Sequence, residues 1–167
     1  DPQKITLIQI APSVRTSWGE ELGLPREEAT VERLAACLRK IGFNYIFDTD
    51  FAADLTIMEE ATELIHMLSD GNEHKFPLFT SCCPGWVRFV KARYPEFLPQ
   101  LSSAKSPQQM FGAIAKSYYA EALAVDSKDI YSVSAMPCIA KKEEAAYPSM
   151  NSANGQDQDV DTVLTVR

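Results

Sequence analysis

Apolar and polar residues along the chain follow two alternating patterns, which predict strands and helices in turn. The segment 4–11 is β-branched and apolar and is ended by Pro12, which is typical of a buried strand. Runs of this kind predict parallel strands near residues 4–11, 44–48, 76–81, 130–136 and 160–166. Each run is too hydrophobic to leave one face of a sheet in water.

Helical periodicity separates these strands. After Thr30, the residues Val31, Leu34 and Leu38 share one face, and Gly42 is a typical position for the helix to end. Further helices are predicted at residues 16–22, 55–68, 86–93 and 107–123. We therefore predict an α/β fold with a mostly parallel sheet and helices on both faces. The polar stretch 151–159 predicts a loop, and an apolar strand at the end without a covering helix suggests part of a larger domain.

Composition and charge exclude several classes of function. The 167 residues are enough for one domain with a real core, and 46% hydrophobic and 23% charged residues are ordinary for a soluble protein. A net charge of −7 argues against a nucleic-acid-binding surface. No apolar run reaches the roughly 18 residues of a membrane span, and no signal-peptide pattern is visible. We expect a cytoplasmic location, with a periplasmic one as the alternative.

The chain has four cysteines: Cys37, Cys82, Cys83 and Cys138. The vicinal pair would be strained as a disulfide, so metal-binding or redox thiols are the better interpretation. The pair follows the strand predicted at 76–81, and Cys138 follows the one at 130–136. Ligands bind at the carboxyl ends of parallel strands, and thiolates are the usual ligands of iron–sulfur clusters. The alternative is a buried, inert cysteine, which we favour for Cys37 on its apolar helix face.

The cysteines lie in two specific motifs. The segments Thr80-Ser81-Cys82-Cys83-Pro84-Gly85-Trp86 and Met136-Pro137-Cys138-Ile139-Ala140-Lys141-Lys142-Glu143-Glu144 resemble TSCCPxW and MPCxxKxxE, the first two signature motifs of the iron-only (FeFe) hydrogenases. Both occur in the family's order, and the resemblance extends across the chain, including residues 11–15, 47–50, 59–64 and 102–108. It implies that residues 1–167 are the N-terminal part of a larger, two-lobed catalytic domain.

The resemblance implies an H-cluster as cofactor. This is a four-iron, four-sulfide (4Fe-4S) cubane joined through a cysteine sulfur to a two-iron unit with CO, CN and dithiolate ligands. It reversibly reduces protons to H₂ with electrons from a ferredoxin-like carrier. By resemblance, Cys83 and Cys138 are two cubane ligands. The third family motif, which supplies the remaining cysteines, is absent from this sequence. We therefore expect the chain to be inactive alone and completed by the rest of the domain, on the same or another chain.

The resemblance also implies a proton path. Cys82 is the thiol that exchanges protons with the dithiolate amine, and a thiol ionises near enough to neutral pH, at about 8.5, to do so. The path then leads outward through Glu60, Ser102 and Glu63. The two glutamates lie on one helix face, where the simpler interpretation is an exposed acidic surface, which we keep for Glu59. Met67 stands where some relatives have arginine, so the outer end is expected to use water or His66 instead.

Other residues are implied to surround the two-iron unit. Lys141 corresponds to the residue that binds a cyanide, a role that suits a cation with three donors, whereas we expect Lys142 to be solvated. Met136 is implied to pack on the same unit with its thioether. The pocket is completed by Pro12, Ser13, Pro107, Gln108 and Pro137. Without the resemblance, Pro12 would simply end a strand and Met136 would belong to the core.

Two other functions compete with a hydrogenase fragment. One is a non-catalytic or sensory iron–sulfur-binding relative of the same fold, although such a site does not need the thiol of Cys82. The other is a metal-free thiol redox protein that uses only the vicinal cysteines. Carbonyl and cyanide infrared bands would indicate a hydrogenase, and iron–sulfur absorption alone would indicate the relative. The absence of both signals would leave the thiol redox protein.

Overall fold

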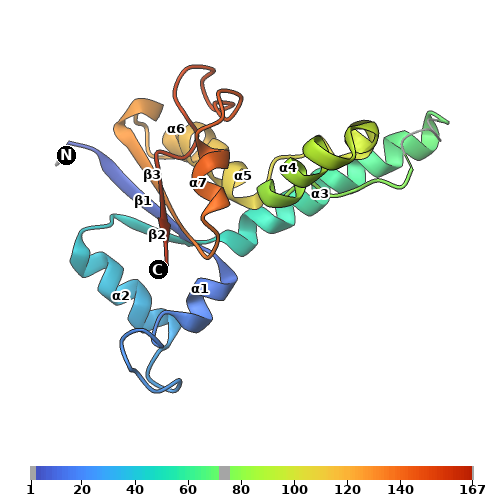
Figure 1. Cartoon of the computed structure of the whole chain (residues 1–167). Coiled ribbons are helices and arrows are strands. Elements are labelled where there is room, and N and C mark those ends of the chain that lie inside the picture. Colours follow the sequence, from blue (N-terminus) through green and yellow to red (C-terminus); the bar gives the residue numbers. More distant parts are fainter. Residues whose placement is uncertain (1–2, 72–75, 167) are drawn as a thin grey trace.

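The computed structural model describes residues 3–71 and 76–166 and contains one parallel sheet. Its strands are β1 (Ile5–Ile10), β2 (Tyr45–Asp48), β3 (Ile130–Met136) and β4 (Thr162–Thr165). They lie in the order β2-β1-β3-β4, and Leu7 of β1 pairs with Tyr45 on one side and Ser132 on the other. Figure 1 shows helices on both sides of this sheet. The predicted α/β class and four of the five predicted strands are thus confirmed.

The prediction of a strand at residues 76–81 is wrong. This segment is extended, but its only pairing among the described residues is one bridge between Phe79 and Leu101. The Phe79 N–H donates to the carbonyl of Gln100 at 2.8 Å, and the Phe79 carbonyl accepts the Ser102 N–H at 2.7 Å. The Phe79 ring packs edge-on against Trp86, with a centroid distance of 5.8 Å. Phe79 of this apolar run therefore packs against aromatic side chains rather than within the sheet.

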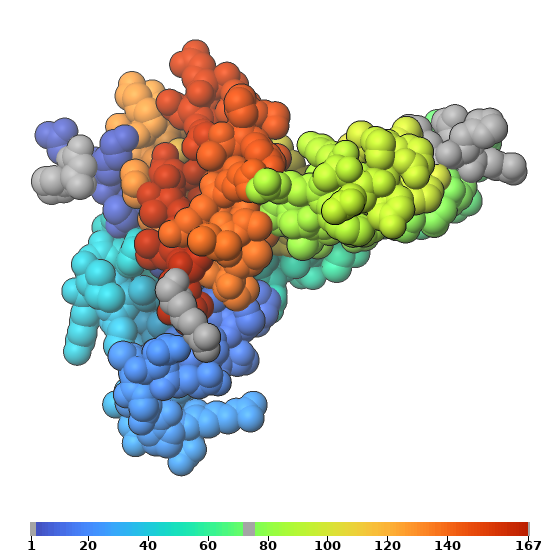
Figure 2. Space-filling model, in the orientation of Figure 1, coloured from blue at the N-terminus to red at the C-terminus, as the bar shows by residue number. Residues whose placement is uncertain are grey.

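The chain between the strands is largely helical. The α-helices are α1 (Pro12–Ser17), α2 (Val31–Ile41), α3 (Thr49–Ser69), α4 (Pro84–Arg93), α5 (Pro107–Ile114), α6 (Ala120–Ala122) and α7 (Ala140–Ala145). Shorter elements are the 3₁₀ helices η2 (Pro95–Gln100) and η4 (Ser127–Asp129) and the π-helix η3 (Ala115–Tyr119), which joins α5 to α6. Among the described residues, no helix has both the length and the apolar character that a membrane span requires. In the space-filling view, α3 and α4 lie in a part that projects from the body (Figure 2).

Most helix predictions are confirmed, but the first is displaced. Instead of residues 16–22, the helix begins at Pro12, because proline without an N–H donor suits the first turn of a helix. The helix α2 has the predicted bounds: the Thr30 hydroxyl accepts the Arg33 N–H, and Gly42 has a φ of 118° that favours glycine. Cys37 is exposed rather than buried, so our interpretation of it as a core cysteine is wrong.

Two apolar clusters cover the two faces of the sheet. On one face, Ile10 packs with Val14 of α1 and Val163 of β4, and Leu38 of α2 joins them. On the other face, Leu7 packs with Phe111 of α5. Successive side chains of β1 thus reach opposite cores, which explains why the strand is mostly apolar and lacks a regular alternation with polar residues.

An arginine joins the segments at the carboxyl edge of the sheet. Arg15 of α1 forms ion pairs with Asp48, the last residue of β2, and with Asp50, in the first turn of α3. The Asp48 carboxylate also accepts the Asp50 N–H at 3.0 Å and so caps α3. These contacts fix the start of α1, and with it Pro12 and Ser13, relative to the start of α3.

The polar segment 151–159 is a loop, as predicted, but it is anchored by a buried carboxylate. Asp159 is fully buried and accepts from Lys105 Nζ at 3.0 Å and from the Ser152 and Ala153 amides. Gly112 of α5 permits the close approach, because a Cβ there would lie 2.7 Å from the Asp159 carbonyl oxygen. The loop is therefore held against α5 and does not extend freely from the surface.

Candidate functional site

Four of the predicted site residues lie where two parallel strands end. The Ala11 N–H donates to the Ala135 carbonyl at 3.0 Å, which holds the ends of β1 and β3 together. Pro12 and Ser13 follow β1, and Pro137 and Cys138 follow β3, and all four are exposed. This edge is where parallel sheets usually bind ligands.

The two vicinal cysteines differ in how they are held. Cys83 precedes α4, and its sulfur accepts the Trp86 N–H at 3.4 Å, so the side chain caps the helix. Among the described residues, none hydrogen-bonds the exposed thiol of Cys82. An anchored sulfur suits a cluster ligand, whereas a sulfur free of partners suits a group that gains and loses a proton.

Side chains of α7 bring the two cysteine motifs together. The Lys141 Nζ donates to the Cys82 carbonyl at 2.7 Å, although the two residues are 59 positions apart. On the outer surface, Arg88 of α4 forms an ion pair with Glu143. The motif that contains Cys82 and Cys83 therefore lies against the helix that follows Cys138. Lys142 is exposed, as predicted.

Gln108 is buried and hydrogen-bonds two other elements. Its side chain is about 1% exposed, and its Oε1 accepts from the Ser134 hydroxyl of β3 at 2.8 Å. Its Nε2 donates to the Lys141 carbonyl at 3.1 Å. Gln108 therefore connects α5, which begins at half-buried Pro107, with β3 and with α7.

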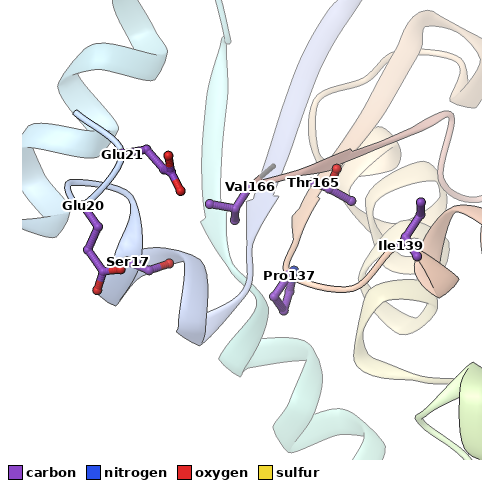
Figure 3. A pocket seen from close by; sticks show the side chains of 7 residues that line it. All are labelled: Ser17, Glu20, Glu21, Pro137, Ile139, Thr165 and Val166. Atoms are coloured by element: carbon purple, nitrogen blue, oxygen red, sulfur yellow. The ribbon is translucent and has the colours of Figure 1, made fainter. Parts of the chain in front are cut away.

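Met136 and Pro137 lie on opposite sides of the boundary between core and surface. Met136 is 4% exposed and packs with Ile10 and Val14, the core position that the hydrophobic pattern alone suggests. Pro137 borders a cavity of about 450 Å³ at the carboxyl ends of β3 and β4. Figure 3 shows the seven lining side chains, among them Pro137 and Val166 opposite the turn that follows α1.

The three residues of the predicted proton path form a hydrogen-bonded group. The Ser102 hydroxyl donates to Glu63 Oε2 at 2.6 Å. Glu60, one turn earlier on α3, hydrogen-bonds the Ser102 side chain and the Ser81 backbone, next to Cys82. The order Cys82, Glu60, Ser102, Glu63 is thus compatible with the positions of all four residues.

Burial raises the pKa of Glu60 above its ordinary value of 4.5. The negative charge of Glu63 raises this pKa further, while a hydrogen bond from the Ser81 backbone lowers it. A carboxyl group whose pKa is moved toward neutral pH is better suited to pass protons in both directions.

A cavity of about 600 Å³ lies at the outer end of this group. Its walls include Glu63, His66 and Met67 of α3 together with Ser103 and Lys105 of the segment before α5. Met67 itself is 6% exposed, so it forms a wall and does not reach into solvent. His66 therefore lies at the outer end of the group, where we expect it or water to serve the path.

Comparison with known proteins decides the family. The family described as "Iron only hydrogenase large subunit, C-terminal domain" matches residues 4–167. The chain belongs to the iron-only hydrogenase family. The NADP-reducing hydrogenase subunit HndD of Solidesulfovibrio fructosivorans is 50% identical over 172 residues, which cover 100% of this chain and 29% of that protein. Iron hydrogenase 1 of Clostridium pasteurianum is 46% identical over 99% of this chain and 28% of its own length.

Solved structures of iron-only hydrogenases have the same fold. An apo [FeFe]-hydrogenase from Chlamydomonas reinhardtii superimposes with a TM-score of 0.88 at 44% identity and covers 99% of this chain and 42% of its own. The chain therefore spans less than half of these hydrogenases and is part of a larger domain. A more distant relative, the bovine cytosolic iron-sulfur assembly component 3, is 34% identical over 99% of this chain and 35% of its own length.

The donor set of this chain fits part of a cluster site. Two thiols, those of Cys83 and Cys138, are exposed; Cys138 follows β3, and the residue before Cys83 is bonded to Lys141 of α7. Among the described residues, no group of three or more His, Cys, Asp or Glu side chains could hold a metal ion. Two thiolates are half of the four that a cubane usually has, so the residues fit a site completed by other ligands.

Two residues near this site were missed by sequence reasoning. Ser103 donates to Glu63 through both its N–H, at 3.1 Å, and its hydroxyl, at 3.0 Å. Glu144 pairs with Lys141 at 3.0 Å. The only available signal for Glu144 was its place at the last position of the MPCxxKxxE motif, three residues after Lys141.

Replacing Glu60 and replacing Glu63, both on α3, should have opposite effects on the stability of the fold. At pH values above 4.5, the folded chain binds more protons at Glu60 than the unfolded chain, so this group destabilises the fold as pH rises through that window. Glu60→Gln removes this penalty, and we expect an unfolding midpoint at pH 7 equal to or above that of the unmodified chain. Circular dichroism during thermal unfolding measures the midpoint.

Glu63→Gln is the matched comparison. The Glu63 carboxylate accepts from two hydroxyls and one backbone amide, so replacing its charge should cost about 1.5–3 kcal/mol and lower the midpoint at pH 7. At pH 4, where protonated Glu60 carries no charge, Glu60→Gln should no longer differ from the unmodified chain. Equal destabilisation by the two variants at pH 7 would contradict the environment described for Glu60.

Proposed function

We propose that this chain is part of a hydrogenase that reversibly reduces protons to H₂ at an H-cluster, with electrons from a ferredoxin-like carrier. The contact between Lys141 Nζ and the Cys82 carbonyl is the observation that carries this proposal. It unites the two motifs that the family uses for its cluster, and it does so at the carboxyl edge of the sheet. Identities of 50% and 46% to two hydrogenases, against 34% to an iron–sulfur assembly component, also favour a hydrogenase.

The chain would contribute both ligands and surroundings to the cluster. Cys83 and Cys138 would hold the four-iron cubane, which other cysteines of the complete domain would finish. When bound, the H-cluster would pass on the electrons of the carrier and supply the metal centre at which H₂ is made. An ammonium has three N–H donors, and those of Lys141 serve the Cys82 carbonyl and Glu144. One donor is left for a cyanide. Pro12, Ser13 and Pro137, exposed at the same edge, would line the pocket.

The chain would also carry protons. Cys82 would receive a proton from Glu60, whose carboxyl group hydrogen-bonds the Ser81 backbone next to it. The Ser102 hydroxyl has one hydrogen, which it donates to Glu63 at 2.6 Å, so its oxygen can accept the proton of a protonated Glu60. Passage outward would then end at Glu63, which borders the outer cavity.

The test uses the complete catalytic domain, with this chain joined to the remaining part and the cluster inserted without oxygen. We expect the irons of both the cubane and the two-iron unit, infrared bands of CO and CN ligands, and H₂ production from a reduced ferredoxin. Iron–sulfur absorption without these bands and without H₂ would show a non-catalytic or sensory relative instead. Absence of both iron and sulfide would leave only a thiol redox protein.

A further inference from the structure

A buried carboxylate lies beneath the predicted cyanide-binding lysine. Glu144 of α7 is 5% exposed, and three side-chain donors converge on its Oε2 atom. The Ser106 hydroxyl donates at 2.9 Å, Gln108 Nε2 at 3.3 Å and Lys141 Nζ at 3.0 Å. A buried carboxylate requires such compensation, because an unpaired charge inside a protein is strongly unfavourable.

The donors to Glu144 come from different parts of the fold. Ser106 lies 38 positions before Glu144 and immediately precedes α5, and Gln108 belongs to the first turn of α5. Lys141 is on α7 itself, one turn before Glu144. Gln108 is in turn bonded to Ser134 of β3. One carboxylate oxygen therefore joins α7 to α5, and through Gln108 to the central sheet.

The position of the Lys141 ammonium depends on this carboxylate. The Lys141 side chain is 14% exposed, and its Nζ has two acceptors, Glu144 Oε2 and the Cys82 carbonyl. The carbonyl is neutral, so Glu144 supplies the only negative charge paired with this half-buried cation among the described residues. A long lysine side chain has many rotamers, and a fixed partner is what selects one of them.

We propose that Glu144 is a positioning residue. Its buried carboxylate holds Lys141 Nζ against the Cys82 carbonyl and so fixes the position of the ammonium that would face the cluster. This inference rests on the proposed function for the role of Lys141, but the pairing of Glu144 with Lys141 is a property of the chain itself. A neutral residue at position 144 would leave the lysine without its charged partner and free to turn toward solvent.

The first test measures how readily Lys141 is acylated in the full 167-residue chain. Glu144→Gln keeps the size of the side chain and removes its charge, so we expect acylation of Lys141 by an activated ester to rise severalfold, as quantified by peptide mass spectrometry. Glu143→Gln is the matched control, because Glu143 is the preceding residue on α7 but pairs with Arg88 on the surface. An unchanged rate in Glu144→Gln, or an equal rise in both variants, would overturn the proposal.

A second variant covers the possibility that Glu144→Gln fails to fold. The double variant Lys141→Met with Glu144→Gln removes both charges together, so no unpaired cation remains. We expect it to unfold at a higher temperature than Glu144→Gln alone. If adding Lys141→Met does not raise the unfolding temperature of Glu144→Gln, then Glu144 acts on the fold independently of Lys141, and the positioning role is wrong.

The third measurement uses the complete, cluster-loaded domain and reads a spectrum rather than a rate. The infrared cyanide stretches should shift in Glu144→Gln and stay in place in Glu143→Gln, because only the first change moves Lys141. Bands that do not move would overturn the positioning role while leaving the proposed hydrogenase function intact. A complete lack of CO and CN bands in the unmodified domain would instead reject the proposed function and leave the acylation result standing.

Discussion

Cys82→Ser in the complete catalytic domain is expected to leave the cluster assembled and to lower H₂ turnover by about 100-fold or more. The Cys82 thiol is exposed, and no described residue hydrogen-bonds it, so its loss removes no anchor of the fold. A serine hydroxyl has nearly the same size and still forms hydrogen bonds, but it ionises far above neutral pH and relays protons poorly. Iron content, CO and CN infrared bands and H₂ production are the three measurements.

Cys83→Ser provides the comparison within the same dipeptide. The Cys83 sulfur is fixed by the Trp86 N–H at the start of α4, and we assign it to the cubane. Because a hydroxyl is a poor replacement for a thiolate iron ligand, this variant should lose iron as well as activity. Equal loss of iron in both variants would show that the relay and ligand roles are misassigned.

The strands were predictable because a strand that is buried on both faces of a sheet has a mostly apolar sequence. The strand β1 sends Leu7 to one core and Ile10 to the other, so no polar alternation interrupts it. The segment 76–81 has a similar apolar character, yet its Phe79 is half-buried and packs against Trp86 and Phe97. An apolar run therefore indicates a segment that packs against other apolar residues, but it does not specify whether these belong to a sheet or to another part of the fold.

The errors at Pro12 and Cys37 also have physical causes. A proline after an apolar run can end a strand, begin a helix or do both, and Pro12 does both. Cys37 lies three residues after Leu34, about 60° from it around the helix, at the margin of a face that packs through Leu34 and Leu38. Helical spacing gives the direction of a side chain, but it does not give the width of the buried stripe.

The site was predictable as a set of residue types but not as a set of contacts. The two motifs identify the cysteines and Lys141, because these are local strings. The contact of Lys141 with Cys82 spans 59 positions, and that of Ser106 with Glu144 spans 38. Such pairings depend on how the segments before α4 and α5 pack against α7, which no local spacing encodes. Glu144 was missed for this reason.

The predicted proton path yields the other large effect. In the complete domain, Glu60→Gln and Glu63→Gln should each lower H₂ turnover by about 100-fold or more, with unchanged iron content and infrared bands. An amide preserves the shape of the side chain but has no acidic proton to pass on. Ser102→Ala should act similarly, because its hydroxyl donates to Glu63 at 2.6 Å and also bonds Glu60.

Glu59→Gln is the internal control for the path. Glu59 is exposed on α3, about 100° around the helix from Glu60, and it borders the outer cavity together with Glu63. It therefore carries negative charge near the entrance but is not a step between Cys82 and Ser102, so its variant should keep turnover near that of the unmodified domain. The thermal unfolding measurements separate a loss of proton transfer from a loss of stability, since Glu60→Gln is expected to be at least as stable as the unmodified chain. A loss of turnover in a variant that is not destabilised and keeps its cluster leaves proton transfer as the property removed. If Glu59→Gln cripples turnover and Glu60→Gln does not, protons enter through the outer cavity by another route, and the path assigned to α3 is wrong.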